Sequence, residues 1–140
     1  MPPTPTDKPW LCFTATQANS SIRMNKVGSA PEVSLEYSTD GATWSDYTWS
    51  GNNGIQVPLA TVGAKAYFRA KNDNTHFDSA TDYTHNYNNF VGTGKFSVSG
   101  NIMTLLKGDG SLVDFPEGTT DYDYAFGLLF DSCASIDDAS

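Results

Sequence analysis

The chain has 140 residues and a formal net charge of −8, from 16 acidic and 8 basic residues. This length fits one domain and is sufficient to bury a hydrophobic core without disulfides or metal ions. A surface this acidic repels phosphate groups, so the charge argues against nucleic acid and anionic membranes as partners.

Residues 1–9 include four prolines: Pro2, Pro3, Pro5 and Pro9. Proline has no N–H and keeps the chain extended, so this segment is predicted to be a linker and not a strand inside a sheet. It lacks the apolar stretch of a signal peptide, and no apolar run in the chain approaches the length of a membrane span. We therefore expect no direct insertion into a membrane.

Residues 33–49 (VSLEYSTDGATWSDYTW) carry the clearest pattern in the chain. Apolar and polar residues alternate up to the turn signal Asp40-Gly41, which predicts a β-hairpin with one buried face. Three aromatic residues follow the turn: Trp44, Tyr47 and Trp49. We expect Trp44 in the core, whereas Trp49 precedes a Ser-Gly-Asn-Asn-Gly turn and fits a buried or an exposed position equally well.

Further short strands with turn signals between them are predicted over residues 10–15, 21–24, 55–59, 66–70, 90–98 and 102–106. Pro58 places one of these segments, 55–59, at a sheet edge or a bulge. The strands follow one another too closely for helical crossovers. The predicted fold is therefore an all-β antiparallel sandwich, Ig-like or jelly-roll-like, over residues 10–118.

Residues 119–140 change character. Apolar positions recur at helical spacing over Tyr122, Phe126, Leu129, Cys133 and Ile136. We predict a C-terminal amphipathic helix whose apolar stripe is an interface, covered either by the sandwich or by a neighbour.

The two cysteines, Cys12 and Cys133, lie near opposite ends of the chain among apolar residues. Nothing in the sequence brings them together, so buried free thiols and one long-range disulfide both stay open.

No catalytic constellation is visible, and we do not expect an enzyme or a cofactor. Both histidines, His76 and His85, fall in a polar segment without regular period, residues 72–89, which is predicted to be a long loop. A triad would have to draw its partners from that one loop.

The same loop offers oxygen ligands at Asp73, Asn74, Asp78 and Asp82. Calcium needs six or more oxygens, and the spacing does not match an EF-hand. These residues are therefore only a weak calcium candidate, and no metal site is expected.

A ligand platform is the stronger hypothesis. Aromatic residues in or near predicted loops lie beside side-chain amides, and sugars are bound by aromatic faces with amides taking the hydroxyls. The predicted ligand-binding residues are Tyr47, Trp49, Asn52, Asn53, Tyr83 and Tyr87, with Asn86, Asn88 and Asn89 nearby. The same residue types also suit a protein interface.

Several short segments resemble a known family. They are CFTA (12–15), LEYSTDGATW (35–44), YFRAKN (67–72), GNIMTLL (100–106) and YAFGLLFDSCASIDDAS (124–140). Together they resemble the N-terminal β-domain of BspA-like leucine-rich-repeat surface proteins of gut Bacteroidales. In that family a β-sandwich precedes repeats with an F-x-x-C-x-x-L-like pattern, and residues 130–136 (FDSCASI) look like the start of the first repeat.

The resemblance implies a non-catalytic adhesion module at a cell surface or outside the cell, with a protein or glycan partner and the C-terminal helix as a cap for downstream repeats. Similar modules in phages of the same bacteria suggest the alternative of a virion structural protein that contacts neighbouring subunits. A carbohydrate-binding module attached to an enzyme is a third, minor hypothesis.

Overall fold

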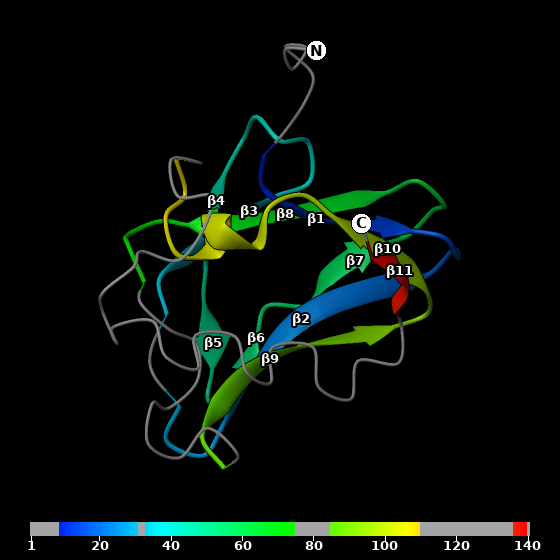
Figure 1. Cartoon of the computed structure of the whole chain (residues 1–140). Coiled ribbons are helices and arrows are strands. Elements are labelled where there is room, and N and C mark those ends of the chain that lie inside the picture. The colour runs from blue at the N-terminus through cyan, green and yellow to red at the C-terminus, as the bar shows by residue number, and fades with distance from the viewer. Residues whose placement is uncertain (1–8, 31–32, 75–84, 110–135, 140) are drawn as a thin grey trace.

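The computed structural model describes residues 9–30, 33–74, 85–109 and 136–139, the last of these as backbone. In this part of the chain, two β-sheets form the two layers of a sandwich (Figure 1). The predicted all-β, sandwich-like fold is confirmed.

The larger sheet has six strands in the order β11-β10-β1-β8-β3-β4. The neighbours pair antiparallel except β10 and β11, which are parallel. The strands are β1 (Leu11–Ala15), β3 (Leu35–Ser38), β4 (Ser45–Tyr47), β8 (Lys65–Ala70), β10 (Phe96–Ser99) and β11 (Ile136–Ala139).

The smaller sheet is built around its longest strand, β2. One edge of β2 pairs antiparallel with β9 along seven residue pairs, from Ser21↔Thr93 to Val27↔Tyr87. The other edge pairs first with β7 and then with β6, which in turn pairs with β5. The strands are β2 (Ser20–Val27), β5 (Trp49–Ser50), β6 (Asn53–Gly54), β7 (Val57–Leu59) and β9 (Tyr87–Thr93). Pro58 lies in β7, which among the described strands pairs with β2 alone, so its predicted edge position is confirmed.

The core lies between the sheets and is rich in phenylalanine. Phe13, Phe68, Phe90 and Phe96 are fully buried, and the ring of Phe13 lies 4.8–5.7 Å from the other three, centroid to centroid. The rings meet edge-on or tilted, an arrangement worth about 0.5–1.5 kcal/mol per pair beyond the buried area. This cluster joins three strands of the larger sheet to β9 of the smaller one.

The predicted hairpin at residues 33–49 is confirmed as β3 and β4, with Leu35 opposite Tyr47. Gly41 has a φ of 74°, which suits glycine at a turn. The Asp40 carboxylate accepts the N–H groups of Ala42 and Thr43, each at 2.8 Å. These bonds, with that from Thr43 the strongest, hold the pKa of Asp40 well below its usual range.

Tyr47 connects the two layers. It belongs to β4 of the larger sheet, yet its hydroxyl accepts the N–H of Met24 in β2 at 2.8 Å and donates to the carbonyl of Ile55 at 2.6 Å. Met24 lies on β2 between the residues paired with β7 and the one paired with β6. The tyrosine hydroxyl therefore supplies the acceptor that a neighbouring strand would otherwise provide.

The sequence predicts one strand over residues 90–98, whereas the chain forms two, β9 and β10, in different sheets. Gly94, with a φ of 74°, turns the chain between them. β9 also begins at Tyr87, so residues 87–89 belong to a strand and not to the predicted loop.

The strand predicted over the apolar residues 102–106 is wrong. Ile102–Leu105 form a 3₁₀-helix, η1. The side chain of Asn101 caps the helix by accepting the N–H of Met103 at 2.9 Å. Leu105 and Leu106 are buried, so their apolar character serves packing against the core and not a place in the sheet.

The predicted C-terminal helix is wrong at its end, because Ile136–Ala139 form strand β11. Parallel pairing with β10 gives these residues an extended backbone, which a helix cannot have. The rest of the predicted helix, with Tyr122, Phe126, Leu129 and Cys133, lies outside the described residues, as does most of the predicted linker at residues 1–9. Cys12 carries a buried free thiol.

Replacing Tyr47 by phenylalanine removes the hydroxyl and leaves the Met24 N–H and the Ile55 carbonyl without their partner. We expect the free energy of unfolding to fall by about 1–3 kcal/mol, the cost of unsatisfied buried groups. Urea denaturation of the two proteins measures this change, and equal midpoints would contradict the role of the hydroxyl.

Burial raises the pKa of Tyr47 from 10.0 to about 12. The folded state therefore holds this proton more tightly than the unfolded state. The resulting stability is complete below pH 10 and is lost as the pH rises toward 12. Denaturation across this range should show a smaller loss for Tyr47→Phe than for the original chain. The comparison with the variant is needed because burial also raises the pKa of Tyr67.

Candidate functional site

The inner face of the smaller sheet changes from apolar to polar toward one end. On β2, Ile22 and Met24 face the core. Lys26 comes two residues after Met24 and therefore lies on the same face of the sheet. On β9, Phe90 is opposite Met24, and Asn88 is opposite Lys26. Asn88 is only 1% exposed. The space between the sheets is thus filled by phenylalanines in the middle and bordered by a lysine and an amide at this end.

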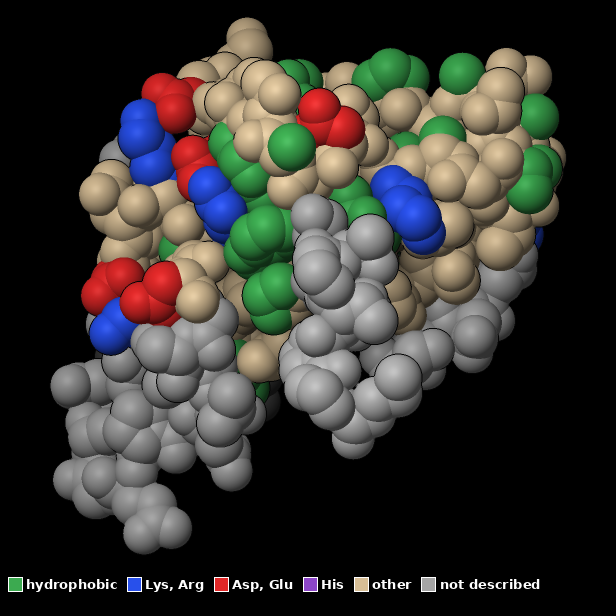
Figure 2. All heavy atoms as spheres, turned by 90° about the horizontal axis from the view of Figure 1, so that it is seen from above, with side chains coloured by type: hydrophobic (Ala, Val, Ile, Leu, Met, Phe, Trp, Pro, Cys, Tyr) green, Lys and Arg blue, Asp and Glu red, His purple; other side chains and the backbone are tan. Residues whose placement is uncertain are grey.

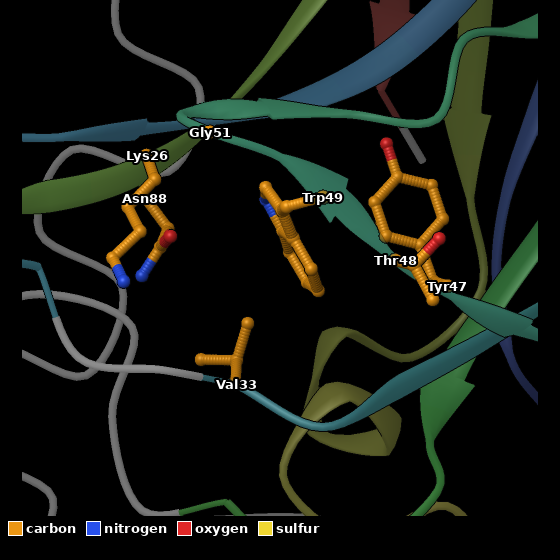
Figure 3. Close-up of a pocket in the computed structure, with 7 residues that line it drawn as sticks. All are labelled: Lys26, Val33, Tyr47, Thr48, Trp49, Gly51 and Asn88. Atoms are coloured by element: carbon orange, nitrogen blue, oxygen red, sulfur yellow. The ribbon is translucent and has the colours of Figure 1, made fainter.

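A pocket of about 370 Å³ opens at this polar end. It is lined by Lys26, Val33, Tyr47, Thr48, Trp49, Gly51 and Asn88 (Figure 3). Both sheets contribute to the lining, because Tyr47 ends β4 while Trp49 begins β5. The volume is within the range of small-molecule sites.

Trp49 stands in the middle of the pocket lining. Figure 3 shows it between Tyr47 on one side and Lys26 and Asn88 on the other. Tyr47 contacts it edge-on, with 5.0 Å between the ring centroids and 82° between the planes. The side of the indole toward Lys26 and Asn88 is therefore the side that a ligand can approach.

The indole N–H of Trp49 is a buried donor without a hydrogen-bond acceptor in the described part of the chain. Leaving such a donor unsatisfied costs about 1–3 kcal/mol. In Figure 3 the nitrogen lies on the side of the ring that faces Lys26 and Asn88. The nitrogen has almost no exposed surface, so a ligand oxygen can bond to it only if the surrounding side chains move aside.

The structure brings together some of the predicted ligand-binding residues and separates others. Tyr47 and Trp49 line the pocket, but Asn52 and Asn53 do not, and the Asn53 side chain accepts a hydrogen bond from Arg23 at 2.7 Å. Tyr87 is half-buried on β9 beside the pocket residue Asn88 and is absent from the described lining. Tyr83 lies outside the described residues.

The sequence reasoning missed four lining residues, which are Lys26, Val33, Thr48 and Gly51. Lys26 is the charged one among them. The predicted strand ends at residue 24, whereas β2 continues to Val27. Continuing the alternation of Ile22 and Met24 by two residues would have placed Lys26 on the inner face.

Trp44 lies on the outer face of the larger sheet, so its predicted core position is wrong. Its ring is 4.9 Å from that of Trp10, and the Arg69 guanidinium lies 3.7 Å from its centroid. The Arg69 Nε also donates to Glu36 at 2.6 Å. Figure 2 views the molecule from this side and shows hydrophobic side chains beside Lys, Arg, Asp and Glu. Arg69 covers a ring face of Trp44, which leaves that face unavailable for stacking on a sugar.

Asn74, one of the predicted calcium ligands, has a structural role instead. The Asn74 amide is 9% exposed. It accepts the N–H of Ser34 at 2.9 Å and donates to the carbonyls of Ser34 at 3.0 Å and Leu105 at 2.9 Å. Asp73 is exposed, while Asp78 and Asp82 lie outside the described residues. Within the described ranges, no three His, Cys, Asp or Glu residues group so as to hold a metal ion.

Of the two histidines, His85 is exposed and His76 lies outside the described residues. Among the residues that are described, no helix is long and apolar enough to cross a membrane. No protein-family model, curated protein or solved structure matches this chain. The case for a function therefore depends on the pocket itself.

Replacing Asn74 by alanine should lower the free energy of unfolding by about 3 kcal/mol, because backbone groups of Ser34 and Leu105 lose their partners in a buried place. Asn72→Ala is the matched control. Its amide donates to the Ser34 hydroxyl at an exposed position, so we expect a change below about 0.5 kcal/mol. Chemical denaturation tests both, and similar losses for the two variants would refute the structural role of Asn74.

Proposed function

We propose that the protein is a non-catalytic binding module that holds a glycan at a cell surface, with a sugar residue in the pocket around Trp49. The observation that carries this proposal is the partly buried indole of Trp49 with an unsatisfied N–H, placed between Tyr47 and the polar pair Lys26 and Asn88. This role agrees with the adhesion function that the family resemblance implies.

The chemistry of the lining suits a sugar. A pyranose ring has an apolar face of C–H groups, which packs on an aromatic ring, and a rim of hydroxyls that both donate and accept hydrogen bonds. The Lys26 ammonium has three N–H donors and can donate to those hydroxyls, and the Asn88 amide makes the same end of the pocket polar. The lining combines the aromatic rings of Tyr47 and Trp49 and the apolar side chain of Val33 with the polar side chains of Lys26, Thr48 and Asn88. Aromatic side chains with a few placed polar groups are common in small-molecule sites.

The shape of the pocket favours a glycan over a folded protein. A stable protein interface buries about 800 Å² on each partner and needs a broad surface. The pocket instead lies between the two layers and is lined by seven described residues. A chain end or a branch of a glycan can enter such a space, with the rest of the polymer outside.

A glycan array probed with the full chain tests the proposal. We expect at least one glycan to be retained, and Trp49→Ala to lower its affinity at least tenfold, which corresponds to about 1.4 kcal/mol. Trp49→Phe keeps an aromatic ring but removes the N–H, and should give a smaller loss.

Trp44→Ala is the matched control, because it removes a tryptophan from the outer face of the other sheet and should leave glycan affinity unchanged. Circular dichroism and thermal unfolding verify that each variant is folded. The proposal fails if the original chain retains no glycan, or if folded Trp49→Ala binds as tightly as the original chain.

A further inference from the structure

The edge of the larger sheet at β10 is completed by a segment from far along the chain. β11 pairs in parallel with β10, in the register Phe96↔Ile136, Ser97↔Asp138 and Val98↔Ala139 (Figure 1). β10 on its other side is held antiparallel by β1 through four residue pairs. β10 is therefore a fixed part of the sandwich, and β11 is the strand added at its outer edge.

The β10–β11 pairing has three features that weaken a strand pair. It spans four residues, is parallel, and has a register irregularity between Phe96 and Ser97. Parallel pairs are slightly less stable per residue than antiparallel ones, and short edge strands open at a low free-energy cost. When β11 leaves, β10 presents unpaired N–H and C=O groups, which are a template for another strand.

The connection to β11 is long enough to allow a choice of partner. Residues 110–135 lie between the last described residue near the core, Asp109, and the first residue of β11. At about 3.4 Å per residue such a segment can extend to about 90 Å. A folded chain of this size has a radius of gyration of about 14 Å, so the edge of a neighbouring copy is within reach.

We propose that the β10 edge is a strand-acceptor site whose second occupant is residues 136–139 of another copy of this chain. The structure shows that this segment fits this edge, and a second copy offers the same segment with the same backbone hydrogen bonds. Strand addition at a sheet edge is a common mode of recognition. Reciprocal exchange gives a closed dimer, and one-way exchange gives a linear assembly.

Two single-cysteine chains test the exchange. One carries Ser97→Cys and the other Asp138→Cys, both with Cys133→Ser, so that the remaining native thiol is the buried Cys12. Register partners on neighbouring strands have Cα atoms about 5 Å apart, within disulfide reach. After the two chains are mixed, unfolded and refolded together, we expect a disulfide-linked heterodimer whose yield rises with chain concentration.

A chain that carries both cysteines is the control for the register, and it should form an intramolecular disulfide when dilute. If this control forms and the mixed chains give no heterodimer at any concentration, the exchange is refuted. If the control does not form, the β10–β11 pairing and the proposal fail together. Glycan binding is measured separately, so neither result bears on the Trp49 pocket.

A second measurement tests whether the backbone hydrogen bonds of β11 hold the dimer together. Asp137→Pro/Asp138→Pro removes two N–H groups from β11, whereas Asp137→Asn/Asp138→Asn keeps both and makes the same charge change. We expect sedimentation to show a dimer that is lost in the proline variant and retained in the asparagine variant. Equal dimer fractions in both variants would overturn the proposal.

Discussion

One tyrosine hydroxyl joins the two layers of this sandwich, and the pocket depends on it. The hydroxyl of Tyr47 is hydrogen-bonded to the Met24 N–H in β2 and to the Ile55 carbonyl, and the ring of Tyr47 packs against one side of Trp49. The position of Tyr47 also explains why residue 54 is glycine. A Cβ at Gly54 would collide with the Tyr47 ring and would lie 2.7 Å from the carbonyl oxygen of Met24. Packing, hydrogen bonding and the wall of the pocket thus meet at one side chain.

Much of the sandwich follows from alternation, because a half-buried strand must place apolar residues at every second position. The segment around Phe68 shows this plainly, because Ala66, Phe68 and Ala70 are buried and the residues between them are not. The misses arise where tertiary contacts decide. At Gly94 a Cβ would lie 2.9 Å from the Cα of Ser20, and only a chain already folded presents that neighbour. At residues 102–105, the Thr104 hydroxyl accepts the N–H of Leu11 from β1, and together with the local cap from Asn101 this favours a 3₁₀-helix in a run that is apolar enough for a strand.

The candidate site is partly visible in the sequence. Tyr47 and Trp49 are two residues apart and share the inner face, whereas Trp44 is three residues before Tyr47 and must lie on the opposite face. This parity is enough to separate the two tryptophans. That Lys26 and Asn88 lie side by side is harder to predict from the sequence, because it depends on the pairing of β2 with a strand about sixty residues later.

The pairing of β2 with β9 also governs how the chain folds. One edge of β1 pairs with β10 and one edge of β2 pairs with β9, so these two early strands gain their last partners only when late parts of the chain are present. Closing loops of this length costs entropy before the final contacts form, so we expect slow folding, on a scale of about milliseconds to seconds. A nascent chain that has emerged only as far as β8 leaves one edge of β1 and one edge of β2 without a partner strand, and it depends on continued synthesis to cover them.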